Sequence, residues 1–341
     1  MGKKVTMKDI AKELGVSAVT VSKALSGKEG VSESVRETIK SKADEMGYRY
    51  NALGKSMREG KNYNVGILIA EQFMHDSAFY SKMYQSLIKD LLQFDYFGIL
   101  EIIPGQEEKE CTMPRILQNN KVDGIILLGQ MKREYIRMIH KTNIPYIFLD
   151  FTDDSFNADT IISDNVHGSY EITKYLISQG HKKIGFVGNR LATTSIMDRY
   201  IGCYKALLEN KLGIQEDWII ADRDDQGTFI DLILPKDMPT AFVCNCDKIA
   251  YELVLLLKKK GYRVPEDVSV VGYDNYIFAT LSDPQLTTVE VNVNAMSEMA
   301  VMSILRRIQN PTTESGRKVI SGSIIIRDSV ANRIDKCNDI N

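Results

Sequence analysis

A cation and several small hydroxyl groups lie close together in the stretch GVSAVTVSKALSG, residues 15–27. If this stretch is a short helix, Val21, Ala24 and Leu25 lie on one face and can be buried. The opposite face carries two small apolar groups, a hydroxyl and a cation, namely Ala18, Val19, Ser22 and Lys23. Lysine reaches guanine acceptors in the major groove of DNA, and small apolar groups touch thymine methyls. Short hydroxyls bind phosphate oxygens, which predicts that Ser17, Thr20 and Ser22 fix the register of the helix on DNA.

Three short helices are predicted around this stretch. Thr6 caps MKDIAKEL with Asp9 in the capping-box position, and Gly15 allows a tight turn before Ser17 caps the second helix. Ser32 caps the third helix, whose buried stripe is predicted to comprise Val35, Ile39, Ala43 and Met46. Two helices joined by a short turn that contains Gly form a helix-turn-helix. Residues 1–50 are therefore predicted to be a three-helix DNA-binding domain; the alternative is a small helical cap with a scattered surface Val.

Residues 51–61 are basic and rich in small residues, and they are predicted to be a hinge. Asn51 can cap a short helix in which Leu53 and Met57 share one face. Such a helix is marginal alone. It can form where two copies meet on DNA, with Met57 wedged between base pairs from the minor groove and Lys55 near phosphates. The alternative is a flexible linker with Met57 packed on the body.

The charge is divided unevenly along the chain. Residues 1–61 contain 13 Lys and Arg against 8 Asp and Glu, whereas the remaining 280 contain 30 against 37. A cationic segment joined to an acidic body is typical of a small module that binds a polyanion. Five cysteines without a paired framework, and an N-terminus without a long apolar run, predict a reduced cytoplasmic protein with no signal peptide. No segment approaches the roughly 20 apolar residues of a membrane-spanning helix, so no membrane role is expected.

From Asn64 onward, short apolar runs alternate with amphipathic segments. The runs are 65–70, 97–103, 123–129, 145–150, 183–189, 241–245 and 268–274. Continuous runs predict strands buried on both faces, and their alternation with helices predicts parallel sheets. About 270 residues exceed one comfortable core. The predicted fold class is therefore α/β, with a two-lobed body over 62–335: one lobe of about 62–162 and 292–321, the other of about 163–291 and 322–335.

A ligand is expected in the cleft between the lobes, at the carboxyl ends of the strands. If the ligand is a sugar, its hydroxyls need carboxylates, amides and a guanidinium, and its apolar face needs an aromatic ring. Asp150 and Asp274 each end an apolar run, and Arg199 lies in the segment MDRYIGCYKAL. These residues are candidates for ligand binding. The alternatives to ligand binding are a loop cap at Asp274 and a domain-bridging ion pair at Arg199. Four further aromatic residues are either cleft or core, namely Phe79, Tyr80, Trp218 and Tyr276.

The thiols and histidines do not predict a metal site or an enzyme. Cys244 and Cys246 are two residues apart and are expected on one side of a strand, but no second Cys or His pair at zinc spacing accompanies them. The four histidines are scattered, and neither G-x-S-x-G nor a Walker phosphate loop is present. The thiols are therefore predicted to be structural, and the chain is predicted to have no cofactor and no catalytic activity.

Nearly the whole chain resembles the lactose repressor/galactose repressor (LacI/GalR) family of bacterial transcription regulators. The family pattern V-S-x-x-T-V-S-[RK]-x-L is met from Val16 to Leu25, and NALGKSMREGK resembles the family's hinge helix. TIISDNVHGSYEITKYLISQGHKKIGFVG, RVPEDVSVVGYDN and LTTVEVN resemble its periplasmic-sugar-receptor-like body. Tyr50 stands where the family usually has Pro, and Gly54 where it usually has Ala. Because Gly disfavours helix, this hinge is expected to depend on DNA for order.

The resemblance implies roles for individual residues. Ala18, Val19 and Lys23 would read the operator, and Met57 would be the hinge wedge in place of the usual Leu. Cys246 stands where the family commonly has a ligand-contacting Asn, which leaves that contact open. The predicted DNA-binding residues are Thr6, Ser17, Ala18, Val19, Thr20, Ser22, Lys23, Asn51, Lys55 and Met57. The predicted ligand-binding residues are Phe73, Asp150, Arg199, Cys246 and Asp274.

The leading hypothesis is a homodimeric repressor that binds a pseudo-palindromic operator in double-stranded DNA and is released by a small carbohydrate effector. In one alternative the fold is the same, but a ligand or a phosphocarrier protein acts as corepressor. In the others, the chain is an α/β sugar-processing enzyme with a helical appendage, or a receptor that never touches DNA. An effector-dependent shift in operator affinity without turnover would distinguish a regulator from an enzyme.

Overall fold

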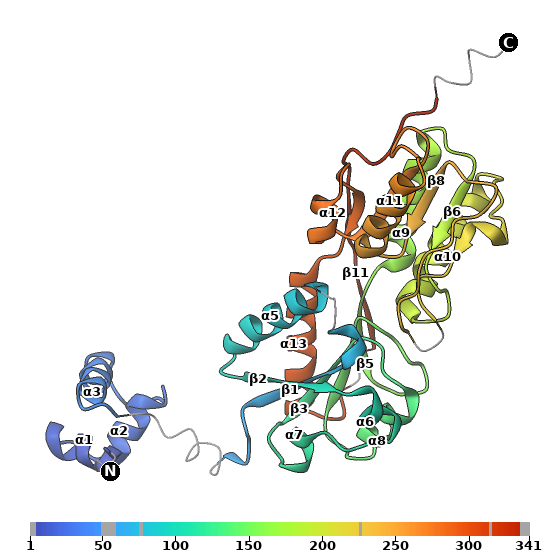
Figure 1. Ribbon diagram of the computed structural model, residues 1–341. Helices are drawn as coiled ribbons and strands as arrows, with labels where there is room; N and C mark the ends of the chain where they lie inside the picture. The colour runs from blue at the N-terminus through green and yellow to red at the C-terminus, as the bar shows by residue number, and fades with distance from the viewer. Residues whose placement is uncertain (1–4, 49–58, 75–77, 225–226, 314–315, 335–341) are drawn as a thin grey trace. The chain divides into compact units, whose positions relative to one another are not determined.

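The computed structural model describes residues 5–48, 59–74, 78–224, 227–313 and 316–334. The chain forms two compact units, Met1–Asn62 and Tyr63–Asn341. Each unit has its own core and is described by itself (Figure 1). The predicted hinge residues Asn51, Lys55 and Met57 lie outside the described residues.

The N-terminal unit contains three helices, α1 (Met7–Leu14), α2 (Ala18–Leu25) and α3 (Glu33–Glu45). Thr6 and Asp9 form the predicted capping box on α1, and Gly15 ends that helix in the left-handed conformation with φ 65°. Ser17 caps α2, because its Oγ accepts a hydrogen bond from the Thr20 amide at 3.0 Å. The helices bury a small shared core of Ile10, Ala11, Val21, Ala24, Ile39 and Ala43. The predicted helix-turn-helix arrangement is therefore present.

The predicted buried stripe of α3 is wrong at its first turn. Val35 is 38% exposed, whereas Ile39 and Ala43 are buried. Arg36 turns inward instead: its guanidinium donates to the carbonyl oxygens of Ala24 at 3.0 Å and Lys28 at 2.9 Å. Ala24 lies in the last turn of α2 and Lys28 lies just beyond it, where carbonyl oxygens have few helical donors. Hydrogen bonds to these carbonyl oxygens stabilise the domain more than burial of the Val35 methyl groups would. The first turn of α3 therefore turns Arg36, and not Val35, toward α2.

The second unit contains two six-stranded sheets. The first has the order β11-β5-β4-β3-β1-β2, and the second has the order β12-β10-β9-β8-β6-β7. Every strand pair is parallel except β10 with β12, which is antiparallel. The strands of the first sheet are β1 (Asn64–Ala70), β2 (Phe97–Ile103), β3 (Gly124–Leu128), β4 (Tyr146–Leu149), β5 (Asp159–Ser163) and β11 (Arg317–Ile320). Those of the second are β6 (Ile184–Val187), β7 (Ile219–Ile220), β8 (Ala241–Cys244), β9 (Ser269–Asp274), β10 (Thr287–Glu290) and β12 (Ser323–Ile325).

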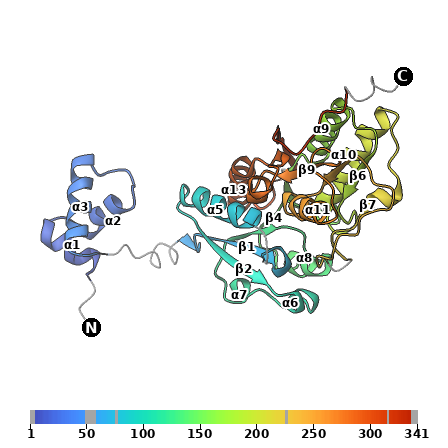
Figure 2. The same ribbon diagram turned by 45° about the horizontal axis from the view of Figure 1, so that its top comes forward.

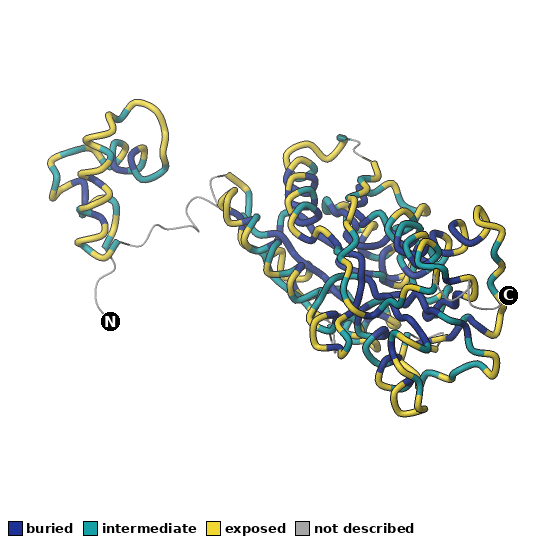
Figure 3. Tube along the Cα trace, turned by 90° about the horizontal axis from the view of Figure 1, so that it is seen from above, coloured by how far each residue is buried: buried dark blue, intermediate teal, exposed yellow. Residues whose placement is uncertain are grey.

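Helices cover these sheets, and the buried residues run along the strands between them (Figures 2 and 3). Helix α13 packs on β3, β4, β5 and α5, and helix α9 packs on β8, β10, β12 and α10. We call the first sheet with its helices lobe A and the second sheet with its helices lobe B. The longer helices are α5 (Ala78–Leu92), α8 (Arg133–His140), α9 (Asn165–Ser178), α10 (Thr194–Glu209), α11 (Asp247–Lys259) and α13 (Val293–Gln309). The short ones are α6 (Gly105–Lys109), α7 (Arg115–Gln118), α12 (Ile277–Leu281) and the 3₁₀ turns Glu71–Phe73 and Glu216–Trp218.

The chain passes between the lobes at three places, which we call crossovers 1, 2 and 3. Crossover 1 joins β5 to α9 around Asp164, crossover 2 joins β10 to α13 at 291–292, and crossover 3 joins β11 to β12 at 321–322. The Asp164 amide donates to the Ile320 carbonyl at 2.9 Å, which links crossovers 1 and 3. Gly322 lies directly against Glu290, since a Cβ at Gly322 would be 2.3 Å from the Glu290 carbonyl oxygen. The three crossovers therefore contact one another.

Helix α10, which carries Arg199, crosses α9 at a very short distance. A Cβ at Gly202 would lie 2.1 Å from the carbonyl oxygen of Val166. We expect Gly202→Ala to lower the free energy of unfolding by about 1–3 kcal/mol, because the two helices must separate. At Gly213 a Cβ would meet nothing within 4 Å. Gly213→Ala should therefore change the free energy by less than about 0.5 kcal/mol in the same urea titration, and equal effects of the two substitutions would contradict the close crossing.

Candidate functional site

The outer face of α2 has the exposure that base reading requires. Val19 is 65% exposed, and Lys23 is exposed beside it on the next turn. Ala18, Thr20 and Ser22 are half-buried, and Thr6 and Ser17 are exposed. The Oγ atoms of Ser17 and Thr20 lie 2.8 Å apart, so the two hydroxyls form one polar spot at the start of the helix. A helix start that presents hydroxyls and amides, followed by a methyl surface and a cation, fits phosphate and base contacts respectively.

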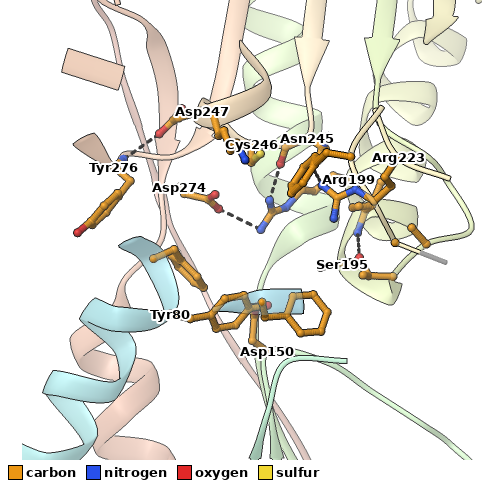
Figure 4. A pocket seen from close by; sticks show the side chains of 18 of the residues that line it. Tyr80, Asp150, Ser195, Arg199, Arg223, Asn245, Cys246, Asp247, Asp274 and Tyr276 are labelled. Carbon is orange, nitrogen blue, oxygen red and sulfur yellow. Dashed lines mark hydrogen bonds and ion pairs between the residues drawn. The ribbon is translucent and has the colours of Figure 1, made fainter. Parts of the chain in front are cut away.

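A cleft in the second unit is lined by residues from both lobes (Figure 4). Its space, including the open mouth, is about 1020 Å³. Lobe A contributes residues that follow β1 and β4 and the first turn of α5; lobe B contributes residues that follow β6, β7, β8 and β9. The carboxyl ends of parallel strands meet here, which is where ligands bind in open α/β sheets. The predicted residues Phe73, Asp150, Arg199, Cys246 and Asp274 all line this cleft.

Arg199 is the central cation of the cleft. It is 6% exposed, and its Nη2 lies 3.3 Å from Oδ1 of Asp274. Its Nε donates to Oδ1 of Asn165 at 2.8 Å, and its Nη1 donates to the carbonyl oxygen of Asn245. The guanidinium also lies 3.8 Å from the centre of the Tyr273 ring. Arg199 and Asp274 belong to α10 and β9 of lobe B, so this ion pair does not bridge the lobes.

Asp150 is the main polar group on the lobe A side. The side chain is 6% exposed, and its Oδ2 accepts a hydrogen bond from the Tyr80 hydroxyl at 2.8 Å. Its Oδ1 is buried without a hydrogen-bond partner among the described residues. Burial raises the pKa of Asp150, while the Arg199 charge lowers it. An unpaired buried carboxylate oxygen is costly, so this atom is suited to accept a hydrogen bond from a ligand.

Burial also raises the pKa of Asp274, to about 7; the Arg199 guanidinium lowers it, and nearby Asp150 raises it. The backbone of both carboxylates is strained, with φ 68° at Asp150 and φ 104° at Asp274. Residues with side chains rarely adopt positive φ, and such strain is found most often at functional sites. The surrounding structure holds both residues in this conformation where the strands end.

The segment VCNCD differs from the prediction. Cys246 does not share a strand face with Cys244, because β8 ends at Cys244 and Cys246 is the N-cap residue of α11. The Cys244 side chain is in the core, whereas Cys246 lines the cleft. The described residues hold no group of three His, Cys, Asp or Glu side chains placed to bind a metal. Burial raises the pKa of Cys246 to about 12, so the thiol stays protonated.

The aromatic residues divide between cleft and core. Phe73, Phe79 and Tyr80 form a contiguous group on lobe A, with Tyr80 5.3 Å from Phe73 and 5.2 Å from Phe79 between ring centres. Tyr276 lines the cleft from lobe B. Trp218 is a core residue away from the cleft lining; it is buried, and its Nε1 donates to the Asp237 carbonyl oxygen at 2.8 Å.

Several cleft residues escape prediction from the sequence. Phe229 lies between two cations, with its ring centre 4.6 Å from the Arg223 guanidinium and 4.0 Å from Nζ of Lys248. Arg223 is itself paired with Asp222 at 2.7 Å. The one available signal is that Asp222 and Arg223 come shortly after an apolar pair, Ile219–Ile220, which is too short to be recognised as a strand.

Comparison with known proteins identifies the family. The family described as "Bacterial regulatory proteins, lacI family" matches residues 6–51, and "Periplasmic binding protein-like domain" matches residues 173–330. The HTH-type transcriptional repressor PurR of Vibrio parahaemolyticus serotype O3:K6 (strain RIMD 2210633) is 30% identical over 331 residues, which are 95% of this chain and 98% of that protein. The chain belongs to the lacI family of bacterial regulatory proteins. It is a DNA-binding transcriptional repressor of this family.

Other relatives agree with this assignment. PurR of Glaesserella parasuis serovar 5 (strain SH0165) is 28% identical over 338 residues, covering 96% of this lacI-family chain and 98% of that protein. The lac repressor dimer bound to operator and the anti-inducer ONPF has a TM-score of 0.76 at 22% identity, and the complex of the transcriptional regulator CelR with cellobiose has 0.70 at 23%. Both comparisons cover 96% of this chain and 100% of the other, and they confirm the fold. PurR is a transcriptional repressor and CelR a transcriptional regulator. No helix among the described residues is long and apolar enough to cross a membrane.

The raised pKa of Asp274 predicts a pH dependence of stability. The folded lacI-family chain holds the carboxyl proton of Asp274 more tightly than the unfolded chain does. The stability that this proton contributes is therefore present at low pH and lost as the pH rises to about 7. Between about pH 5 and pH 7, the free energy of unfolding of the wild type should fall by about 1 kcal/mol per pH unit more than that of Asp274→Asn. Chemical unfolding at each pH measures this, with the exposed Asp154→Asn as control. Parallel curves for wild type and Asp274→Asn would contradict the assignment.

Proposed function

We propose that residues 1–50 read an operator through α2, that 51–61 act as the hinge, and that the cleft of the 62–335 body binds a small carbohydrate effector. Binding of the effector releases the repressor from DNA. One observation carries this proposal. The cleft is lined on lobe A by a buried carboxylate oxygen of Asp150 that has no partner among the described residues, and on lobe B by the Arg199–Asp274 ion pair. One small polar ligand that contacts both sides changes how the lobes sit against each other.

The chemistry of the cleft supports a polyhydroxylated ligand. A sugar hydroxyl both donates and accepts, so it can donate to the free oxygen of Asp150 and accept from the guanidinium of Arg199. The rings of Phe73 and Tyr80 supply an apolar surface for a sugar ring. The related CelR forms a complex with cellobiose, which supports a carbohydrate as the ligand class.

The remaining parts of the proposal follow from DNA binding. We infer a homodimer on a pseudo-palindromic operator, because a twofold protein matches a twofold site, and the related lac repressor binds its operator as a dimer. The chromosome of a bacterium lies in its cytoplasm, so a regulator of this kind acts there. The sequence contains neither G-x-S-x-G nor a Walker phosphate loop, and we propose that the cleft binds its ligand without turnover.

Lys23 is proposed to read a base. Lys23→Ala should lower operator affinity and relax base preference at the contacted position by about 1–3 kcal/mol, because the contact to guanine acceptors is lost. Binding to a library of operator variants measures both quantities. The matched control is Lys40→Ala, an exposed lysine on α3, which should leave base preference unchanged. An unchanged selectivity profile in Lys23→Ala would remove Lys23 from the reading set.

The effector prediction is tested on the full chain with an operator fragment located by footprinting. Among common mono- and disaccharides, cellobiose included, the true effector should weaken operator binding by about 5- to 150-fold without being converted to product. Arg199→Ala and Asp274→Ala should abolish this shift and keep operator binding, whereas Arg263→Ala, at an exposed site of lobe B, should respond as the wild type does. Strengthened binding would instead show corepression, product formation would show an enzyme, and a normal response of Arg199→Ala would disprove the assigned cleft.

A further inference from the structure

Asn275 follows the cleft residue Asp274 and carries a second, consecutive positive φ, 52° after 104°. Asn275 is half-buried and does not line the cleft. Its side chain points instead to the connections between the lobes. Nδ2 of Asn275 donates to Oε1 of Glu290 at 3.1 Å, and Oδ1 accepts from Nη2 of Arg327 at 2.6 Å. Both amide atoms are therefore used, one on each partner.

Glu290 lies beside crossovers 2 and 3, because its carbonyl oxygen also contacts Gly322, whereas Arg327 lies at the far end of β12, near the start of β10. Glu290 is the last residue of β10, directly before crossover 2, and Arg327 follows β12, which begins after crossover 3. The guanidinium of Arg327 also donates to the Leu286 carbonyl oxygen at 2.7 Å, which ties it to the segment before β10. Asn275 is thus bonded to both ends of the β10–β12 strand pair.

The cleft residue Asp274 is also connected to crossover 1, through Arg199. Arg199 pairs with Asp274 and donates to Asn165, which begins α9 directly after crossover 1. Arg199 also stacks on Tyr273, whose hydroxyl donates to the Asp164 carbonyl oxygen at 3.3 Å. Residues 273–275 therefore contact crossover 1 at Asp164 and bond Glu290, which lies directly before crossover 2 and against Gly322 of crossover 3.

We propose that Asn275 is a positioning residue that transmits the state of the Arg199–Asp274 ion pair to crossovers 2 and 3. This inference rests on the proposed function of the cleft. A ligand that pulls on Asp274 or Arg199 changes the end of β9. Because the backbone at 274–275 has two consecutive positive φ values and the Asn275 side chain is bonded to both partners, the displacement passes to Glu290 and Arg327. Asn275 itself makes no contact with the ligand.

Asn275→Gly is the cleanest variant, because glycine accepts φ 52° without strain and removes both side-chain bonds. Asn143→Gly is the matched control: Asn143 also has a positive φ of 58°, and it lies in the turn between α8 and β4 of lobe A, away from the cleft lining. Arg199→Lys serves as the perturbation on the cleft side, since it keeps the charge and removes the planar fork.

A double-mutant cycle on the unliganded full chain decides the proposal without an effector or an operator. Amide hydrogen exchange is followed by mass spectrometry in peptides that span 287–295 and 320–330. Arg199→Lys should speed exchange there about threefold in the wild-type and Asn143→Gly backgrounds, but less than about 1.5-fold in the Asn275→Gly background. If Arg199→Lys speeds exchange as much in the Asn275→Gly background as in the wild type, the proposal is overturned. A merely structural role of Asn275 gives free-energy effects of the two substitutions that add independently. If Asn275→Gly does not fold, Glu290→Ala takes its place in the cycle.

A second arm uses the panel sugar that shifts operator binding of the wild type. Asn275→Gly should bind that sugar with a Kd within about twofold of the wild type, whereas its operator shift should fall at least about threefold. An unchanged shift would overturn the inference and leave the proposed function standing. If no sugar acts on the wild type, the proposed effector class fails, and the exchange cycle still decides the role of Asn275.

Discussion

The structure of the cleft depends on keeping one buried guanidinium satisfied. Arg199 is almost completely removed from solvent, and an unpaired buried charge costs several kcal/mol. Each of its three nitrogens has a partner, namely Asn165, a backbone carbonyl and Asp274, and its face is covered by Tyr273. Its remaining N–H groups are available to a ligand. These partners come from different elements of lobe B. The positions of β9, the start of α9 and the end of β8 are therefore all constrained by one side chain.

The ends of the strands concentrate both charge and strain at this place. Asp150, Asp274 and Asn275 have positive φ, although none of them is glycine. Each sheet brings the carboxyl ends of its parallel strands to one edge, and Asp150 from the first sheet and Asp274 from the second line the same cleft. On lobe A, Tyr80 fixes one oxygen of Asp150 and leaves the other for a ligand. The two lobes thus present complementary groups: an acceptor on one side, and a cation with its counter-ion on the other.

Local signals in the sequence carry much of this architecture. The capping box at Thr6, the cap at Ser17 and the apolar runs of seven strands are properties of a few neighbouring residues, and they can be predicted without tertiary contacts. Strands β7, β11 and β12 have two to four residues and no apolar run longer than two residues, so their position depends on the sheet. The placement of Val35 and Cys246 failed for the same reason. Arg36 finds carbonyls of another helix, and β8 stops one residue before Asn245 turns inward to bond Asp222 and Val187.

The contacts among the crossovers determine what kind of response the body can give. Crossover 1 is hydrogen-bonded to crossover 3, and Gly322 leaves no room between crossover 3 and Glu290 beside crossover 2. None of the three segments can move far without displacing another. Packed contacts of this kind favour two discrete arrangements over a continuous bend. A ligand that binds one arrangement better then shifts a two-state equilibrium, and the size of the shift is limited by its difference in affinity for the two states.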